Sequence, residues 1–238
     1  MKRLLFLSAV TGAVLAFGVQ PAAATNECRG LQVCVPVAGP WVVVPARLSS
    51  PRVRVDFQLS CPRGYAVGGL DAELSDRAIE IFFQGKLGSP VGPGTTTGRA
   101  ALFGATYVGA PARTPTFRPR LGCIPASGGG SGPVPYKPRS LVAVYPPGEP
   151  TVRRVRNVRL RPGTVRAIAA CGAGERFITG WQAIGFYGGS PPSAALVRSA
   201  VATRSARRDR VEVSVRGGAA LGTVRAVVQV GAVCGGGS

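Results

Sequence analysis

The stretch that decides the fold opens at Cys61 and closes at Cys123. Its first residues are Cys61-Pro62-Arg63-Gly64-Tyr65-Ala66-Val67-Gly68-Gly69, and its last are Arg120-Leu121-Gly122-Cys123. A looser version begins with Cys171-Gly172-Ala173-Gly174-Glu175-Arg176-Phe177-Ile178-Thr179-Gly180-Trp181 and ends with Gly231-Ala232-Val233-Cys234. The two spans differ in length by a single residue. We interpret them as an ancestral module present twice, each copy closed by its own disulfide.

The cysteines support this interpretation. The chain has six of them, and an even number in an exported protein indicates disulfides. The repeat selects one pairing: Cys61–Cys123, Cys171–Cys234 and, by remainder, Cys28–Cys34. A thiolate metal site is disfavoured, because the sequence has no Cys-x-x-Cys spacing and no histidine. We therefore expect no metal and no other cofactor.

The N-terminal residues have the pattern of a secretory signal peptide. Lys2 and Arg3 are followed by the apolar run Leu4–Gly18 and by three small residues that end at Ala24. This pattern predicts a signal peptide over 1–24, cleavage before Thr25 and secretion. An uncleaved membrane anchor is the alternative, but the run is shorter than the roughly 20 residues that span a bilayer. No later stretch is long and apolar enough to cross a membrane, so no transmembrane segment is expected after cleavage.

The rest of the chain has the pattern of an all-β protein. Every second residue from Val53 to Leu59 is apolar, which places one face of a strand toward a core. Similar short runs recur between Gly- and Pro-rich turns, with no period of 3.6. We expect two tandem β-sandwich-like domains, 25–124 and 138–238, each closed by an intradomain disulfide. A Gly/Ser/Pro linker over 125–137 joins them.

Four local predictions follow from the same patterns. The pair Gly68-Gly69 predicts a β-bulge or the close approach of a neighbouring backbone. Gly217-Gly218 predicts a hairpin turn. The polar segment 71–77 predicts one helical turn. The apolar run Leu141–Tyr145 predicts the counterpart, in the second half, of the run that starts at Trp41.

The motif itself resembles a known type of module. A cysteine followed by Pro-x-Gly or Gly-x-Gly, then by an apolar residue and a glycine pair, and closed by a β-run that ends in cysteine, is similar to β-rich repeats of exported proteins from GC-rich, actinomycete-type bacteria. The resemblance covers most of both halves. The second copy departs from it, because Gly172 follows Cys171 and Gly180-Trp181 takes the place of the glycine pair. The resemblance implies an extracellular β-rich module and brings no catalytic residue with it.

Charge and composition reduce the number of function classes that fit the chain. The chain has 29 basic and 10 acidic residues, a formal net charge of +19 and no histidine. The lack of histidine excludes the usual Ser-His-Asp and Cys-His catalytic arrangements. A strongly basic chain is typical of proteins that bind polyanions. The competing interpretation is compositional, since arginine far outnumbers lysine beside abundant Gly, Ala, Val and Pro, which is the profile of a GC-rich genome.

Arginines concentrate in the second half. Nine of them form the predicted polyanion-binding set: Arg153, Arg154, Arg156, Arg159, Arg161, Arg204, Arg207, Arg208 and Arg210. If the strands at 153–161 and 204–210 are neighbours, one arginine face binds sulfated, phosphorylated or uronic polymers through bidentate pairs. The alternative is a charged strand edge that prevents aggregation. Nucleic acid is not expected as a partner, because no aromatic residues alternate with these arginines.

One acidic cluster is the rival candidate site. It consists of Asp71, Glu73, Asp76 and Glu80. Two carboxylates about 5–10 Å apart can hydrolyse glycosidic bonds. The competing interpretation is a solvated rim that makes salt bridges to nearby arginines, and a calcium site is a minor option.

These observations lead to one prediction and two alternatives. Trp41 and Trp181 lie inside apolar strand candidates, so we expect both in a core rather than stacked on sugar rings. The predicted function is that of a secreted, non-catalytic binding or surface module, with an anionic cell-envelope polymer or glycan as its candidate partner. The alternatives are a carboxylate-based glycan hydrolase and a purely structural exported protein without a ligand. The sequence leaves the oligomeric state open.

Overall fold

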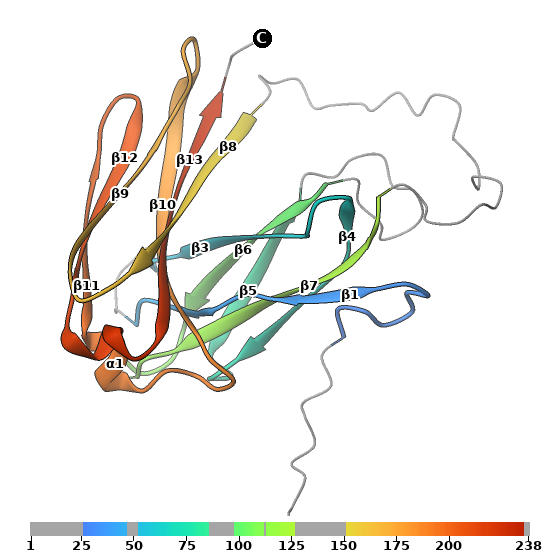
Figure 1. Cartoon of the computed structure of the whole chain (residues 1–238), viewed down its shortest axis with the longest axis horizontal. Helices are drawn as coiled ribbons and strands as arrows, with labels where there is room; N and C mark the ends of the chain where they lie inside the picture. The colour runs from blue at the N-terminus through green and yellow to red at the C-terminus, as the bar shows by residue number, and fades with distance from the viewer. Residues whose placement is uncertain (1–25, 47–51, 86–97, 112, 127–150, 236–238) are drawn as a thin grey trace, which may run out of the picture.

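The structure is a computed structural model, and it describes residues 26–46, 52–85, 98–111, 113–126 and 151–235. The predicted signal peptide, most of the predicted linker and the run Leu141–Tyr145 lie outside these residues. The described part is almost entirely β-structure, which confirms the all-β prediction (Figure 1). Within it, no helix has the length and apolar character required to cross a membrane.

The described residues form thirteen strands, a short α-helix and a 3-10 turn. In the first half of the chain the strands are β1 (Val35–Ala38), β2 (Trp41–Val43), β3 (Val55–Ser60), β4 (Tyr65–Leu74), β5 (Ile79–Gly85), β6 (Ala100–Tyr107) and β7 (Thr116–Pro125). In the second half the elements are β8 (Thr151–Leu160), β9 (Gly163–Ala170), β10 (Arg176–Tyr187), α1 (Ala194–Arg198), β11 (Ala200–Ala206), β12 (Arg210–Gly217), η1 (Ala219–Gly222) and β13 (Arg225–Gly235).

The first half is built from two facing layers. In one layer β7 is central, because it pairs antiparallel with β4 on one side and with β1 and β2 on the other. The other layer is a short sheet of order β3-β6-β5. Phe57, Phe103 and Phe117 are buried between the layers. The alternation in β3 therefore has the predicted effect, since Val55 and Phe57 face this first core.

The second half has the same strand order. β13 is central and pairs with β10 and β8, and the facing short sheet has the order β11-β12-β9. A second core lies between these layers and includes Val211, Val213, Val228 and Val230. In chain order β8 takes the place of β1 and β2, and β9 to β13 take the places of β3 to β7.

The disulfides have the predicted pairing, Cys28–Cys34, Cys61–Cys123 and Cys171–Cys234. The two long-range bridges span 62 and 63 residues, and the Cα–Cα distance is 5.7 Å in both. The third residue after the first cysteine of each bridge is a glycine with positive φ, 81° at Gly64 and 78° at Gly174. Glycine adopts this backbone region without steric cost, which explains why both turns have glycine at this position.

Both central strand pairs also have a bulge at the same step from the disulfide. The register shifts between Val67 and Gly69 in β4 and between Phe177 and Thr179 in β10. The bulge predicted at the glycine pair of the first half is confirmed. The sequence indicated Gly180-Trp181 as its counterpart in the second half, but the bulge there ends at Thr179.

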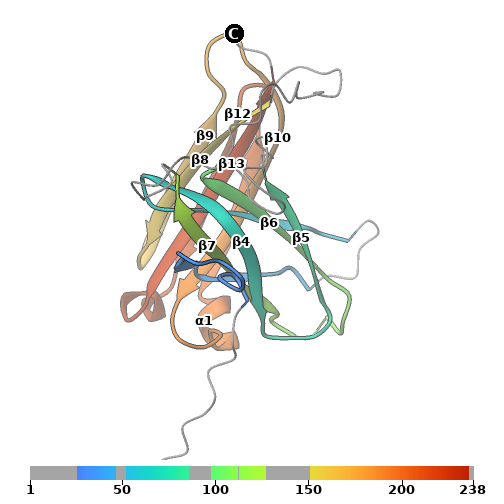
Figure 2. The ribbon, with the colours of Figure 1, turned by 90° about the vertical axis from the view of Figure 1, so that its right-hand side faces the viewer.

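The two halves share one seven-stranded sheet, and the prediction of two separate tandem domains is corrected on this point. β2 pairs with β7 of the first half and also with β10 of the second. In Figure 2 β4 and β7 of the first half lie in front of β10 and β13 of the second. Ala183 and Val227 of the second half pack into the first core. Edge strands leave backbone N–H and C=O groups unpaired, and here the two edges pair with each other. Segments 25–124 and 138–238 are therefore not self-contained units.

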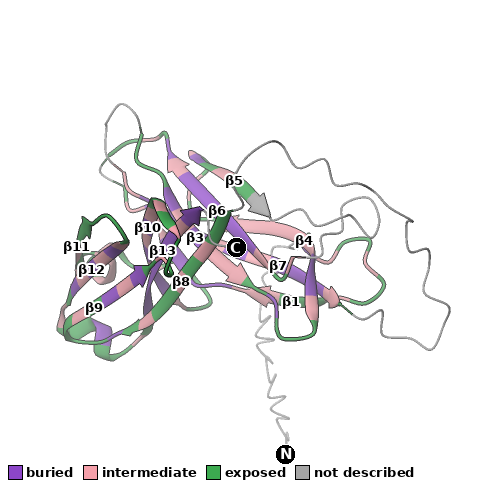
Figure 3. Ribbon diagram, turned by 90° about the horizontal axis from the view of Figure 1, so that it is seen from above, coloured by how far each residue is buried: buried purple, intermediate pink, exposed green. Residues whose placement is uncertain are grey.

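β13 is buried along nearly its whole length, because protein covers both of its faces (Figure 3). Val228 and Val230 face the second core, whereas Val227 faces the first. This position explains its nearly continuous apolar sequence. β8, at the end of the same sheet, is exposed at most of its residues and is rich in arginine.

Two local predictions are wrong, and a third falls on residues that the structure does not describe. Gly217-Gly218 is not a hairpin turn, because β12 and β13 lie in different sheets and η1 carries the chain between the layers. The first part of segment 71–77 continues β4 as far as Leu74, which pairs with Phe117 of β7. In the second half β8 occupies the place of the Trp41 run, and the run 141–145, predicted as its counterpart, lies outside the described residues.

Candidate functional site

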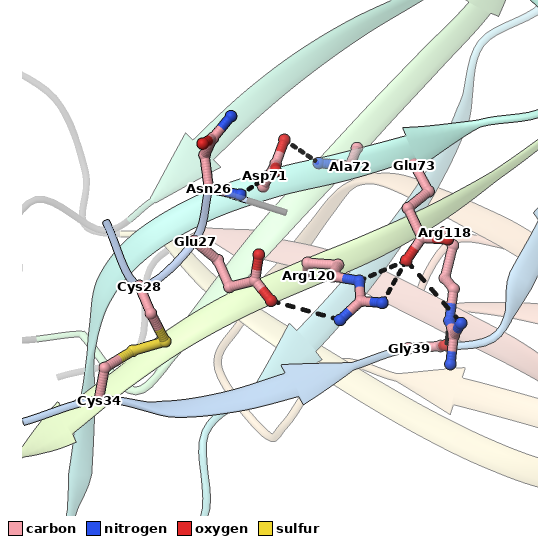
Figure 4. Close-up of polar contacts among 10 residues, drawn as sticks. All are labelled: Asn26, Glu27, Cys28, Cys34, Gly39, Asp71, Ala72, Glu73, Arg118 and Arg120. Atoms are coloured by element: carbon pink, nitrogen blue, oxygen red, sulfur yellow. Dashed lines mark hydrogen bonds and ion pairs between the residues drawn. A yellow bond between two sulfur atoms is a disulfide. The ribbon is translucent and has the colours of Figure 1, made fainter. Parts of the chain in front are cut away.

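The predicted acidic cluster begins on β4, where groups of the protein itself bind the carboxylates of Asp71 and Glu73 (Figure 4). Glu73 Oε1 accepts a hydrogen bond from Arg120 Nε at 2.5 Å and lies 3.8 Å from Arg118 Nη1. Asp71 accepts hydrogen bonds from the backbone N–H of Asn26 at 2.7 Å and of Ala72 at 2.8 Å. These contacts are those of a structural ion-pair network.

The remaining two carboxylates of the cluster are also bound. Asp76 accepts from the N–H of Ala78 at 2.9 Å and from the hydroxyl of Tyr107 at 3.1 Å. The hydrogen bond from Ala78 lowers the pKa of Asp76, against the opposing effect of burial. Glu80 accepts from Thr106 Oγ1 at 3.2 Å. The cluster thus offers no pair of uncommitted carboxylates for general acid–base work.

The face of the long sheet that carries Asp71 and Glu73 is covered by the N-terminal segment 26–34, which we call the leader. Glu27 is 3% exposed and pairs with Arg120 at 3.3 Å. A Cβ at Gly69 would lie 1.8 Å from the carbonyl oxygen of Glu27, and one at Gly122 would lie 2.0 Å from it. Both positions therefore require glycine, which agrees with the close backbone approach predicted at the glycine pair.

The corresponding face of the second half, on β10 and β13, is covered by β3 of the first half. The buried amide of Gln229 accepts from the N–H of Gln58 at 2.6 Å and donates to its carbonyl at 2.9 Å. It also donates to Asn157 Oδ1 at 2.9 Å and accepts from Trp181 Nε1 at 3.3 Å. Trp41 and Trp181 are 4% and 6% exposed, so both are buried, as expected.

The predicted arginines lie on strands at opposite edges of the second half. β8 packs over β9, whereas β11, which carries Arg204, packs against β10 at the other edge. Figure 3 shows this separation. The strands at 153–161 and 204–210 are therefore not neighbours, and they do not form one arginine face.

Most of the set still meets at one end of the second half, beside the Cys171–Cys234 disulfide. β8 begins there, because Val152 pairs with Cys234, and the turn between β11 and β12 lies there, because the N–H of Cys171 donates to the carbonyl of Asp209. Six arginines occupy this end, which we call the arginine end: Arg153, Arg154, Arg204, Arg207, Arg208 and Arg210. Arg156 and Arg159 continue along β8 toward the opposite end, and Arg161 directly follows the strand there.

One carboxylate of the arginine end is closely held. Glu175 accepts hydrogen bonds from Arg154 and from the N–H of Gly172, the latter at 2.6 Å. The bond from Arg154 is the main cause that lowers the pKa of Glu175. In the described part of the chain, Glu175 also belongs to the sole group of clustered metal-ligand atoms, with Cys171 and Cys234. Because these sulfurs form a disulfide, no thiolate is available and the group does not fit a metal.

A second carboxylate of this end, that of Asp209, compensates little of the positive charge. Asp209 lies 3.9 Å from Arg210 and is largely exposed. Arg207 and Arg208, in the same turn, are exposed and have no acidic partner among the described residues. The arginine end is therefore a strongly positive surface.

A groove of about 250 Å³ lies between the two halves, next to the arginine end. Its lining consists of Arg54, Asp56, Leu102, Thr179, Gly180, Trp181 and Val233. Arg54 Nε donates to Asp56 Oδ1 at 2.7 Å, and its guanidinium lies 5.7 Å from the centre of the Phe82 ring. We call this hollow the seam groove.

Two arginines of the predicted set border the seam groove. Arg153 is opposite Val233 in the register, and burial lowers its pKa while the charge of Asp56 acts in the other direction. Arg204 Nη2 donates to the carbonyl of Gly180 at 2.7 Å. The groove thus combines cations from both halves with an apolar floor. A second, larger and more enclosed hollow of about 310 Å³ lies on the outer face of β9, β11 and β12 and has Arg216 as its one charged lining residue.

Sequence reasoning missed Arg54, Asp56 and Gln229. The alternation in β3 placed the first two on the polar face of a strand, but nothing local indicated that the second half covers this face. A signal existed for Gln229, since it is the one polar residue within an apolar run of β13. A buried amide in such a position requires hydrogen-bond partners.

Comparison with known proteins adds no further guide. No protein-family model matches the chain, and searches of curated proteins and of solved structures return no match.

Proposed function

We propose that this protein is a secreted, non-catalytic binding module for an anionic polymer, such as an acidic glycan of the cell envelope. The observation that carries the proposal is the arginine end, where six arginines gather and the carboxylates of Glu175 and Asp209 pair with Arg154 and Arg210. Guanidinium groups pair with carboxylate, sulfate and phosphate through two parallel hydrogen bonds. A polymer with regularly spaced negative charges can engage several of them together.

The state of the carboxylates supports binding over hydrolysis. Asp71, Glu73, Asp76 and Glu80 each accept hydrogen bonds from the protein, and Glu73 is also paired with two arginines. A glycosidase needs one carboxyl group to exchange a proton and a second to face the sugar ring. Neither role suits groups that are committed to internal partners.

The repeated organisation and the disulfides are consistent with the same proposal. We infer that the two halves descend from one duplicated segment and that export through the N-terminal signal precedes disulfide formation. Three disulfides fit an oxidising, extracytoplasmic environment. In such a setting an anionic envelope polymer is an abundant partner.

The proposal is tested by binding to defined polymers across a series of NaCl concentrations. Polygalacturonate and dextran sulfate are expected to bind, and uncharged dextran is not. Binding should weaken steeply with salt, because ionic strength screens surface charge. The double variant Arg207→Gln/Arg208→Gln should bind several-fold more weakly, since each exposed charge pair contributes about 0.2–1 kcal/mol.

A matched control separates position from net charge. Arg63→Gln/Arg77→Gln removes the same charge from exposed positions of the first half and should leave affinity nearly unchanged. Absence of binding to both anionic polymers at every salt concentration would refute the proposal and favour a structural role without a ligand.

A further inference from the structure

We infer that the seam groove is the subsite that takes a single anionic sugar unit, bearing a carboxylate or a sulfate, within the polymer. This inference rests on the proposed function and narrows it to a place and a ligand class. Ligand sites favour junctions between structural units, where side chains from both converge on one hollow. The seam groove is such a junction, and among the described residues the corresponding face of the first half lies under the leader.

The cation on the first-half side is held in place before any ligand arrives. Arg54 donates to Asp56 at 2.7 Å and lies against the Phe82 ring. A Cβ at Gly104 would lie 2.5 Å from Arg54 Nε, so the guanidinium occupies space that only glycine leaves open. Because Asp56 binds the Nε side, the terminal nitrogens are left to bind an anion. A preorganised guanidinium loses little freedom on binding.

The second half supplies the opposing cation. Arg204 extends from β11 to β10, where it donates to the carbonyl of Gly180, a residue that lines the groove. It is exposed and retains further N–H donors. Arg153, half-buried beside Asp56, adds positive charge at the same mouth.

The floor of the groove suits a sugar ring. The half-buried Val233 and the small exposed parts of Leu102 and Trp181 form its apolar surface, and the exposed Thr179 offers a hydroxyl. The C–H face of a pyranose packs on apolar surface while its hydroxyls bond to polar groups at the rim. A volume of about 250 Å³ fits one such unit and not a longer segment, so neighbouring units of the chain would run on toward the arginine end.

The test uses short ligands, whose few charges limit their contacts beyond Arg153 and Arg204, the two residues of the arginine end that border the groove. Tryptophan fluorescence is followed during titration with a galacturonate trisaccharide, a sulfated galactose trisaccharide and neutral galactotriose. Trp181 lines the groove, whereas Trp41 does not, so Trp181→Phe should abolish the signal. We expect a saturable change with one or both anionic ligands and none with the neutral one, and the two anionic arms separate carboxylate from sulfate.

The variants decide where the ligand sits. Arg204→Gln, an exposed substitution that spares the core, and Arg54→Gln should each weaken trisaccharide binding by about tenfold or more. Arg63→Gln/Arg77→Gln should have no such effect. If the two groove variants bind the trisaccharide as tightly as the unmodified protein, or if no trisaccharide binds, the inference is wrong. If the unmodified protein still binds the anionic polymers in that case, the proposed function stands without the subsite. If the unmodified protein binds no anionic polymer, both the proposed function and the subsite are refuted.

Discussion

The pairs β4/β7 and β10/β13 hold the same place in the two halves, yet their outer faces differ completely. On β4/β7 the register sets Asp71 against Arg120 and Glu73 against Arg118, and the leader covers the charges. On β10/β13 the corresponding steps set Trp181 against Gly231 and Ala183 against Gln229, and β3 covers them.

The difference shows that the cover determines the residue types. A backbone approaches β4/β7 so closely that glycine stands at 69 and 122, whereas Thr179 and Val233 occupy the corresponding steps of β10/β13. A Cβ at Gly231 would lie 2.1 Å from the Trp181 ring, so at this step glycine makes room for a side chain and not for a backbone. The disulfide, the bulge and the turn glycine are common to both halves because they belong to the scaffold and not to its cover.

The largest effects are expected from the disulfides. Replacing both cysteines of Cys171–Cys234 by alanine should destabilise the protein by about 4 kcal/mol, and the same change at Cys61–Cys123 should cost about as much, because each bridge closes a loop of similar length. Cys28–Cys34 spans 6 residues, so its removal should cost about 2 kcal/mol. Urea unfolding measures all three, and a large gap between the two long bridges would contradict the equivalence of the halves.

The next largest effect concerns the amide that joins the halves. Gln229→Met should reduce the free energy of unfolding by about 3 kcal/mol, because the N–H and carbonyl of Gln58 lose their partner in a buried site. Gln182→Met is the matched control, since its buried Oε1 has no hydrogen-bond partner in the described part of the chain. We expect a change within about 0.5 kcal/mol there. Equal losses in the two variants would show that Gln229 is not the link.

Exchanging residue types at one register step tests the role of the cover directly. Gly122→Val should displace the leader, with a loss of about 1–3 kcal/mol in stability and faster tryptic cleavage after the exposed Arg29. The converse change, Val233→Gly, should cost about 1 kcal/mol and leave cleavage at Arg29 unchanged. Leader cleavage that is equally slow in both variants would mean that the glycine does not make room for it.

The smallest effect is a pH dependence at the arginine end. Arg154 lowers the pKa of Glu175 from its ordinary 4.5. As the pH falls, Glu175 is therefore protonated in the unfolded chain before it is protonated in the folded protein. The stabilisation is therefore complete above pH 4.5 and is lost as the pH falls through the lowered value. Glu175→Gln should lower Tm at neutral pH and have little effect at the acid end of the window. Thermal scans in this range test the sign, and a constant difference across them would contradict it.

Local signals in the sequence were sufficient for much of the fold. The spacing of Cys61, Cys123, Cys171 and Cys234 predicted the two long disulfides, and the alternation in β3 predicted which side chains enter the first core. The glycine pair predicted a bulge and a close backbone approach. The candidate site was predicted less well, because the sequence left open whether the strands at 153–161 and 204–210 are neighbours. They are not, and six of the nine arginines meet instead at one end of the second half.

The amino-acid sequence alone thus determined the class of fold, the oxidised cysteine pairs and the surplus of arginine, since each depends on residue type, spacing or count. The tertiary structure decided which edges pair, which faces are covered and which charges converge. The clearest case is Gln58 and Gln229, which are 171 residues apart and hydrogen-bonded to each other. No local pattern encodes such a contact, because it exists only after both halves have formed and packed.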